Sequence, residues 1–244
     1  MQKLISYPLS ILFAIVFFIV LLIFHGLQWI ALNLFGYSAH KRVVDFMGFF
    51  LLAASYILGC TYRFKGREDL PIDKPLIFVS NHQSMYDIVA IVWFLNKYHP
   101  KFVSKIELGR GVPGISYNLR HGGSVLIDRK DSKQALTVIR SLGHYISKYN
   151  RSAVIFPEGT RSRDGKLKRF SENGVKMLCK FAPDAYVVPL TVNNSWKLFR
   201  FGKFPLGLGT KLELIVHEPI KVSSMSFDDL FAATQEAIAS KLVK

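Results

Sequence analysis

Residues 81–87 (NHQSMYD) place a histidine and an aspartate where they could act together on a proton. An apolar run, Leu76–Ser80, precedes them and a second apolar run follows, which predicts a strand, a turn and a helix. His82 then lies at the end of the strand, on an exposed edge where catalytic groups often occur. Asp87 in the first helical turn can hold one ring nitrogen as N–H and leave the other as a base. The pattern favours general-base chemistry at His82.

The spacing of this pair is weak evidence when it is taken alone. Seven histidines and ten aspartates in 244 residues predict roughly 0.3 such pairs by chance. The chain has two, His82–Asp87 and His40–Asp45, and only the first has the strand–turn–helix frame. Asp87 also has a structural role open to it, as the acidic partner of a capping box with Ser84 as the N-cap. The residues alone leave both interpretations open.

A second loop, residues 156–162 (FPEGTRS), follows the predicted strand Ala153–Phe156. Gly159 lets a ligand approach the backbone closely, and Arg161 can bind phosphate oxygens through two nitrogens. Further cations follow within a few residues, at Arg163, Lys166, Lys168 and Arg169. A solvated basic loop is the alternative, but it does not explain Glu158 and Gly159 at the end of a strand.

Two more cations follow predicted strands. Lys105 comes after the short strand Lys101–Ser104, and Arg129 comes after Ser124–Asp128. Both could face a phosphate, or both could be ordinary surface cations. The segment between them is interrupted by Pro113, Gly114, Gly122 and Gly123 and is expected to be a long loop.

The two ends of the chain differ in character. No charged residue occurs between Lys3 and Lys41, and Leu9 to Leu34 is almost continuously apolar. That run can span a bilayer core, which needs about 20 apolar residues, and it is longer than the apolar region of a signal peptide. A second apolar stretch, Phe46 to Tyr62, follows an expected loop at residues 38–45. The two stretches predict either a transmembrane hairpin or a helical pair within one leaflet, and a core helix remains an alternative for the second.

Residues 63–244 alternate strands with helices, which predicts an α/β domain with a mixed, largely parallel sheet. This gives a membrane-anchoring region at residues 1–62 and a folded domain at residues 63–244. Besides the strands above, we expect Tyr186–Val192 and Lys211–His217. A proline at position 189 indicates an edge or a bulge in the first of these. The expected helices are Ser84–Asn96, Ser132–Lys148, Glu172–Phe181 and Asp228–Val243.

The charge balance narrows the class of partner. The formal net charge is +15, and residues 1–60 carry only +2 of it (Lys3, Lys41 and Arg42 minus Asp45), so +13 lies on the rest. A basic domain predicts anionic partners. The two cysteines form no CxxC pair, so a disulfide scaffold or Cys-rich metal site is not expected. A membrane-tethered nucleic-acid-binding protein is a remote alternative without a recognisable motif.

These blocks together resemble the glycerolipid acyltransferase family. Residues 81–87 resemble its NHxxxxD block, and residues 156–162 resemble its FPEGTRS block, which is highly specific. The stretch from Lys105 to Arg129 is similar to the block between them, and residues 188–190 (VPL) resemble the last. The match is closest to 1-acylglycerol-3-phosphate (lysophosphatidic acid) acyltransferases. Two departures, Ser116 in place of a glycine and one extra residue in the segment 107–113, bear on the acceptor pocket.

The resemblance implies an O-acyltransferase with an apolar two-helix element before an α/β domain. It would move an acyl chain from a thioester, acyl-CoA or acyl carrier protein, to 1-acylglycerol 3-phosphate, with no covalent acyl-enzyme, cofactor or metal. His82 would be the general base, Asp87 its orienting partner, and residues 158–161 (Glu158, Gly159, Thr160 and Arg161) the acceptor site, with Arg161 on its phosphate. Lys105 and Arg129 are further candidates for binding that phosphate. Another lysophospholipid, a lyso-aminolipid or glycerol 3-phosphate is the alternative acceptor, and a lipid-ester hydrolase the alternative activity. We expect contact with membrane lipids, none with nucleic acid, and the α/β domain on the cytoplasmic face.

Overall fold

A mixed sheet organises the α/β part of the chain, and the computed structural model describes residues 1–66 and 70–243. The strands follow the order β1-β7-β6-β2-β5-β3-β4, with β8 paired to β6. Only the pairs β6–β7 and β6–β8 are antiparallel among the described strands. The bounds are β1 Thr61–Lys65, β2 Leu76–Ser80, β3 Pro100–Lys105, β4 Val125–Ile127, β5 Ser152–Ile155, β6 Tyr186–Asn193, β7 Lys211–Val216 and β8 Ile220–Lys221. The predicted mixed, largely parallel sheet is confirmed.

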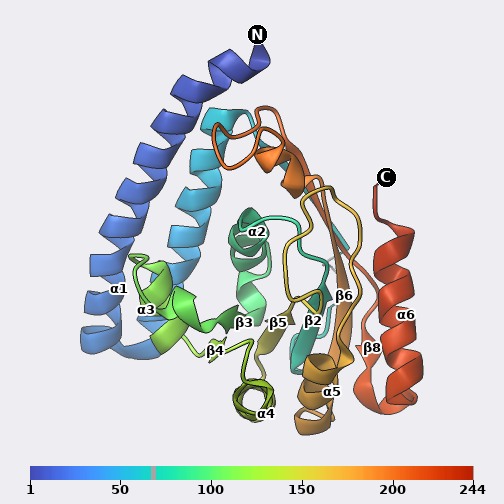
Figure 1. Ribbon diagram of the computed structural model, residues 1–244. Helices are drawn as coiled ribbons and strands as arrows, with labels where there is room; N and C mark the ends of the chain where they lie inside the picture. The colour runs from blue at the N-terminus through green and yellow to red at the C-terminus, as the bar shows by residue number, and fades with distance from the viewer. Residues whose placement is uncertain (67–69, 244) are drawn as a thin grey trace.

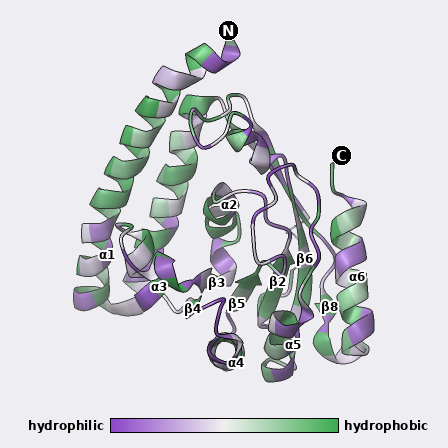
Figure 2. Cartoon of the chain, in the orientation of Figure 1, coloured by the Kyte–Doolittle hydropathy of each residue, from purple (hydrophilic) through white to green (hydrophobic). Residues whose placement is uncertain are grey.

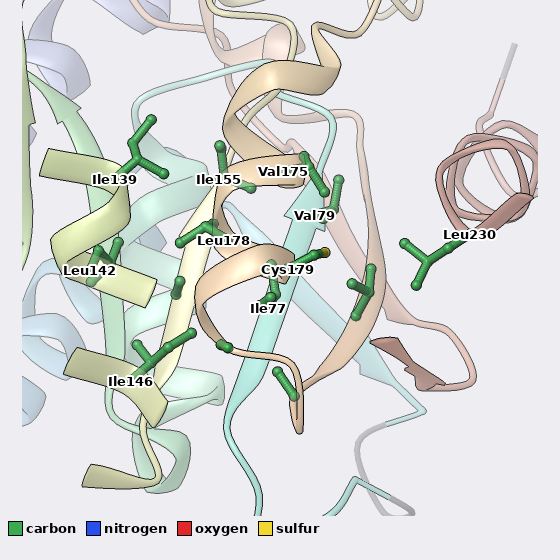
Figure 3. Close-up of a cluster of buried hydrophobic side chains, with 14 of the residues drawn as sticks. Ile77, Val79, Ile139, Leu142, Ile146, Ile155, Val175, Leu178, Cys179 and Leu230 are labelled. Atoms are coloured by element: carbon green, nitrogen blue, oxygen red, sulfur yellow. The ribbon is translucent and has the colours of Figure 1, made fainter. Parts of the chain in front are cut away.

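Helices cover both faces of this sheet (Figure 1). α2 (Tyr86–Phe94) packs on one face, and α4 (Ser132–Tyr149), α5 (Glu172–Phe181) and α6 (Phe227–Ser240) pack on the other. The alternation of side chains along β2 explains why both faces can be covered, since neighbouring residues of a strand point to opposite sides. Ile77 and Val79 join the core beneath α4, α5 and α6 (Figure 3). Leu76 and Phe78 join the core beneath α2.

The N-terminal region is a pair of helical limbs. α1 (Gln2–Ala54) is interrupted at Gly36, where φ is +78°, a conformation that glycine adopts without steric cost. The chain turns there, and both limbs run beside the α/β part (Figure 1). Both limbs are mostly apolar (Figure 2). The predicted two-helix element is confirmed.

The expected loop at residues 38–45 is wrong, because this polar stretch is helical and starts the second limb. Lys41 pairs with Asp45 one helical turn later, and its Nζ donates to the carbonyl of Asn96 at 2.6 Å. These contacts stabilise a helix that apolar periodicity does not reveal. The second limb ends at Ala54, and the 3₁₀ turn Ser55–Leu58 follows, so the expected apolar helix Phe46 to Tyr62 is too long at its C-terminal end.

All the expected strands and helices of the α/β part are present, with ends displaced by a few residues. Two strands and one α-helix among the described residues were not predicted: β1, β8 and α3 (Ile115–His121). β1 is half exposed, and its chain carries Arg63 and Lys65, so it lacks the continuous apolar run of the buried strands. α3 lies in a stretch whose glycines and proline predict a loop.

Candidate active site

Three neighbouring parallel strands, β5, β2 and β6, end at the same edge of the sheet. In open α/β sheets, ligands bind at the carboxyl ends of the strands. The loop after β2 carries His82, the loop after β5 carries Glu158, and the loop after β6 carries Ser195. This edge therefore brings together residues that are far apart in the sequence.

His82 and Asp87 form a direct hydrogen bond. His82 Nδ1 lies 2.9 Å from Asp87 Oδ2, and the side chains are 13% and 0% exposed respectively. A carboxylate accepts only, so Nδ1 carries the proton and Nε2 is left as the basic nitrogen. The Phe156 ring stacks on the imidazole at a centroid distance of 4.1 Å, which restricts its rotation. The pair has the geometry of an oriented general base.

The carboxylate of Asp87 also holds its own loop. Oδ2 accepts from the backbone N–H groups of Gln83 at 2.8 Å and Ser84 at 2.9 Å. The catalytic and structural interpretations of Asp87 are thus compatible, because one oxygen serves both. The N-cap of α2 is Met85 rather than Ser84. Ser84 Oγ accepts from the N–H of Tyr86 instead, at 3.1 Å.

Ser195 is a site residue that the sequence analysis missed. It is fully buried, and its Oγ donates to Asp87 Oδ1 across 108 residues of chain. Asn194 before it has φ +67°, so the chain turns sharply at the end of β6. Asn81 fixes this corner, because its side chain exchanges hydrogen bonds with Val192 at 2.7 and 2.8 Å. The run Asn193-Asn194-Ser195 after an apolar strand was the available signal.

Glu158 supports His82 through the backbone. Its Oε1 accepts the N–H of His82 at 2.9 Å, and the N–H of Ser162 donates to the carbonyl of His82 at 2.7 Å. The loop after β5 therefore holds both polar groups of the His82 backbone. Glu158 Oε2 is buried, with no hydrogen-bond partner in residues 1–66 and 70–243. Burial raises the pKa of Glu158 to about 7.

A cavity of about 440 Å³ opens beside His82. Its polar lining includes Lys105, Arg129 and Thr160. The rest is largely apolar and comes from β3, β4, β5, α2, α4 and the loops beside them, through Ile88, Phe102, Val103, Leu108, Ile127, Ala135, Leu136, Ile139, Ile155 and Phe156. Gly174 of α5 also lines it. A site of this size and lining suits a ligand with an anionic group and an apolar chain.

Comparison with known proteins places the chain among acyltransferases. Residues 61–193, more than half of the chain, match the family described as Acyltransferase. The chain belongs to the acyltransferase family. It is 30% identical over 178 residues to a 1-acyl-sn-glycerol-3-phosphate acyltransferase of Chlamydomonas reinhardtii, covering 72% of this chain and 52% of the relative. It is also 30% identical over 187 residues to the beta form of that enzyme in Homo sapiens, covering 77% and 66%.

Two further similar proteins are also acyltransferases by name. A chloroplastic 1-acyl-sn-glycerol-3-phosphate acyltransferase of Brassica napus is 31% identical over 64% of this chain and 44% of its own length. The chain thus spans about half the length of these first relatives. The crystal structure of a 1-acyl-sn-glycerophosphate acyltransferase from Thermotoga maritima superposes with a TM-score of 0.79 at 24% identity, over 99% of this chain and 96% of that one. This likeness shows that the fold extends through the helical limbs.

The predicted acceptor-site residues of this acyltransferase divide into two groups. Gly159 and Thr160 line the cavity, as do Lys105 and Arg129. Glu158 and Arg161 do not line it. The Arg161 side chain is exposed, and its carbonyl accepts from Lys168 Nζ at 2.8 Å.

The departure at Ser116 lies outside the cavity. Its Oγ accepts from the N–H of Val112 at 3.0 Å and donates to the carbonyl of Leu108 at 2.9 Å. The serine thus closes the turn that leads into α3 and holds the backbone of Leu108, whose side chain lines the cavity.

Other nucleophiles and ligands are poorly placed for chemistry. Both Cys60 and Cys179 are buried, and burial raises the pKa of their thiols to about 11 and about 12. Across the described part of the chain, His, Cys, Asp and Glu nowhere gather in a group of three or more that could hold a metal ion. Beside the cavity, His82 is the group whose geometry suits proton transfer.

Proposed function

We propose that this acyltransferase moves a fatty acyl chain from acyl-CoA or acyl carrier protein to the free hydroxyl of 1-acylglycerol 3-phosphate, giving phosphatidic acid. The observation that carries the proposal is the His82–Asp87 pair, with its 2.9 Å hydrogen bond, on the wall of a cavity that combines two cations with an apolar lining. The names of the relatives support the choice of acceptor.

The proposed chemistry needs a base and no covalent intermediate. Nε2 of His82 takes the proton from the acceptor hydroxyl as its oxygen attacks the thioester carbonyl. The tetrahedral intermediate expels the thiolate, which takes the proton back from His82. Asp87 orients the imidazole and stabilises its charged form. Such proton transfer contributes about 10²- to 10⁴-fold, and positioning of two bound substrates adds to it.

The remaining residues have separate tasks in this proposal. Lys105 and Arg129 bind the acceptor phosphate, and Gly159 and Thr160 form the wall beside it. Glu158 holds the backbone of His82, and Arg161 lies at the exposed rim. The apolar lining takes an acyl chain. The step uses no cofactor or metal.

The first limb of α1 gives access to a lipid acceptor. The helical stretch Gln2–Leu58, to which it belongs, is long and apolar enough to cross a membrane, and many large apolar side chains of the first limb are exposed. They include Leu4, Ile11, Ile15, Phe18, Ile19, Leu22 and Ile23. We infer that this face lies in the membrane, with the basic domain on the cytoplasmic side, where the donor arrives from water.

The test uses detergent-purified protein with lysophosphatidic acid and a labelled acyl thioester. Phosphatidic acid from the wild type, and none from His82→Ala, is the expected result. His144→Ala is the matched control, because His144 is an exposed histidine on α4 away from the cavity, and we expect it to keep full activity. Full activity in His82→Ala would contradict the general-base role.

The choice of substrates is tested in the same assay. Product with acyl-CoA alone or acyl carrier protein alone identifies the donor. Product only with another lysophospholipid, a lyso-aminolipid or glycerol 3-phosphate would replace the proposed acceptor. Release of free fatty acid without acylation would show a hydrolase.

A further inference from the structure

The segment between β6 and β7 carries aromatic and basic side chains and no carboxylate. We define residues 196–208 as the aromatic–basic loop, which begins within the 3₁₀ turn Ser195–Phe199. It contains four aromatic residues and three cations, namely Trp196, Phe199, Phe201, Phe204, Lys197, Arg200 and Lys203. No Asp or Glu occurs from residue 185 to 212. Trp and Tyr concentrate at membrane interfaces, Phe occurs on the lipid-facing side of interfacial segments, and clusters of Lys and Arg attract anionic lipid headgroups.

The loop continues the exposed apolar face of α1. Phe204 is 51% exposed, and its ring lies 5.5 Å from that of Tyr7, which is 40% exposed. The N–H of Leu206 donates to Ser10 Oγ at 2.9 Å. Figure 1 shows the loop at the end of the molecule where α1 begins. The exposed phenyl ring is thus held beside a helix face that we place in lipid.

The inner side of the loop is firmly packed. Leu198 and Leu206 are buried in one cluster with Phe13 of α1, and the N–H of Gly207 donates to the carbonyl of Leu198 at 2.7 Å. A packed inner side and an exposed aromatic and cationic outer side are the features of a surface built to meet a partner. The positive charge, unopposed by any carboxylate in the loop, makes that partner anionic.

We propose that the aromatic–basic loop makes a second contact with an anionic lipid surface, beside the first limb of α1. The proposal rests on the membrane placement of α1 given above. Phe204 enters the interface, and Arg200 and Lys203 bind headgroup phosphates. The loop follows directly on Ser195, which donates to Asp87. The lipid contact is therefore made by the segment that also holds the catalytic carboxylate.

Spin labelling tests the contact, because both native cysteines are buried and a label attaches to an introduced thiol. The full chain carrying Phe204→Cys is labelled and reconstituted in vesicles of phosphatidylglycerol and phosphatidylcholine. We expect collisions with oxygen to exceed those with a water-soluble nickel complex, as at a lipid-immersed site. Ile15→Cys on the exposed face of α1 is the lipid reference, and Ser141→Cys on the exposed side of α4 is the aqueous reference.

Charge neutralisation tests the partner's chemistry. In the labelled Phe204→Cys chain, Arg200→Gln and Lys203→Gln are each expected to lower the lipid-immersed to water-exposed ratio about fivefold, the equivalent of about 1 kcal/mol per cation. The matched control is Lys176→Gln with Lys180→Gln, two exposed lysines of α5, which should leave the ratio unchanged. Vesicles of phosphatidylcholine alone, which carry no net negative charge, should lower the ratio as the two loop variants do.

Three results would overturn the proposal. A water-exposed Phe204 label beside an immersed Ile15 label removes the loop contact and leaves the placement of α1 standing. Dipolar broadening between labels would show that a second copy of the chain covers Phe204. A water-exposed Ile15 label would overturn both the loop contact and the membrane placement of α1. It would not affect the proposed acyl transfer, which the enzymatic assay tests separately.

Discussion

Two histidine–aspartate pairs have the same sequence spacing in this molecule but make different contacts. His82 and Asp87 bind each other at 2.9 Å. His40 instead lies 3.2 Å from Gln28 Oε1 through its Nε2, and Asp45 pairs with Lys41. The second pair lies wholly within α1, where residues five apart point about 140° away from each other. The strand–turn–helix frame lets the chain fold back on itself, so His82 and Asp87 meet while His40 and Asp45 do not.

The largest expected effect comes from replacing the Asp87 carboxylate. Asp87→Asn keeps the shape but presents an amide that can hold the wrong ring tautomer of His82. We expect kcat to fall about 10²- to 10⁴-fold, as such substitutions do in oriented-histidine sites. Steady-state acyl transfer measures this, with KM for the acceptor little changed.

Asp45→Asn is the matched control for this prediction. It alters the same chemical group at the same sequence separation from a histidine. It should change kcat less than twofold while weakening the contact with Lys41. Equal losses in the two variants would remove the distinction between the pairs.

The strand, turn and helix that carry His82 and Asp87 could be predicted from the sequence. The hydrogen bond from Ser195 to Asp87 could not. The strands beside the site are buried on both faces and therefore consist largely of apolar residues, as in Leu76–Ser80 and Tyr186–Val192, which identifies them. His82 and Asp87 are local in sequence, so their meeting was predictable. Ser195 reaches Asp87 only because β6 lies beside β2, and strand order is not encoded in periodicity.

Ser195 gives the next largest effect. Ser195→Ala leaves Asp87 Oδ1 buried without its donor and frees one side of the carboxylate. We expect kcat to fall about tenfold, with the acceptor KM unchanged and the acid limb of the pH–rate profile displaced to higher pH. Ser195→Thr, which keeps the hydroxyl, should recover most of the activity.

Ser152→Ala controls for the loss of a buried serine hydrogen bond. Ser152 is also fully buried, and its Oγ donates to the carbonyl of Tyr98 at 2.8 Å, at the other end of the sheet. It should lower stability by a similar amount without moving the pH–rate profile. A displaced profile in Ser152→Ala, or an unmoved one in Ser195→Ala, would contradict the positioning role.

A pair of glycines extends the comparison from the base to the cavity. A Cβ at Gly174 would meet Ile155 Cδ1 at 2.6 Å and Ile139 Cδ1 at 3.6 Å, and all three residues line the cavity. We expect Gly174→Ala to shift preference toward shorter acyl chains by about tenfold, the low end of what one methylene is worth in a hydrophobic pocket. Competition between labelled thioesters of different length measures it.

Gly143→Ala is the control for packing between α4 and α5. Its Cβ would lie 2.8 Å from Phe181 Cβ, away from the cavity lining. It should lower the melting temperature and leave chain-length preference unchanged. Unaltered preference in Gly174→Ala would show that the apolar lining does not hold the acyl chain.

The smallest effect concerns Glu158, part of the frame that His82 has and His40 lacks. Burial raises the pKa of this carboxyl from 4.5 to about 7 in the folded chain, so the folded state keeps a proton that the unfolded state releases near its ordinary value. Stability from this group is therefore lost as the pH rises from about 4.5 to about 7, by on the order of 1 kcal/mol after solvent screening.

Glu158→Gln cannot ionise, yet its amide oxygen can still accept the N–H of His82. Melting temperatures at pH 5 and pH 8 should therefore differ less in Glu158→Gln than in the wild type, with acyl transfer retained. Glu172→Gln, at an exposed carboxyl in the first turn of α5, should keep the wild-type difference, and an identical slope in Glu158→Gln would show that the buried carboxyl is already ionised at pH 5.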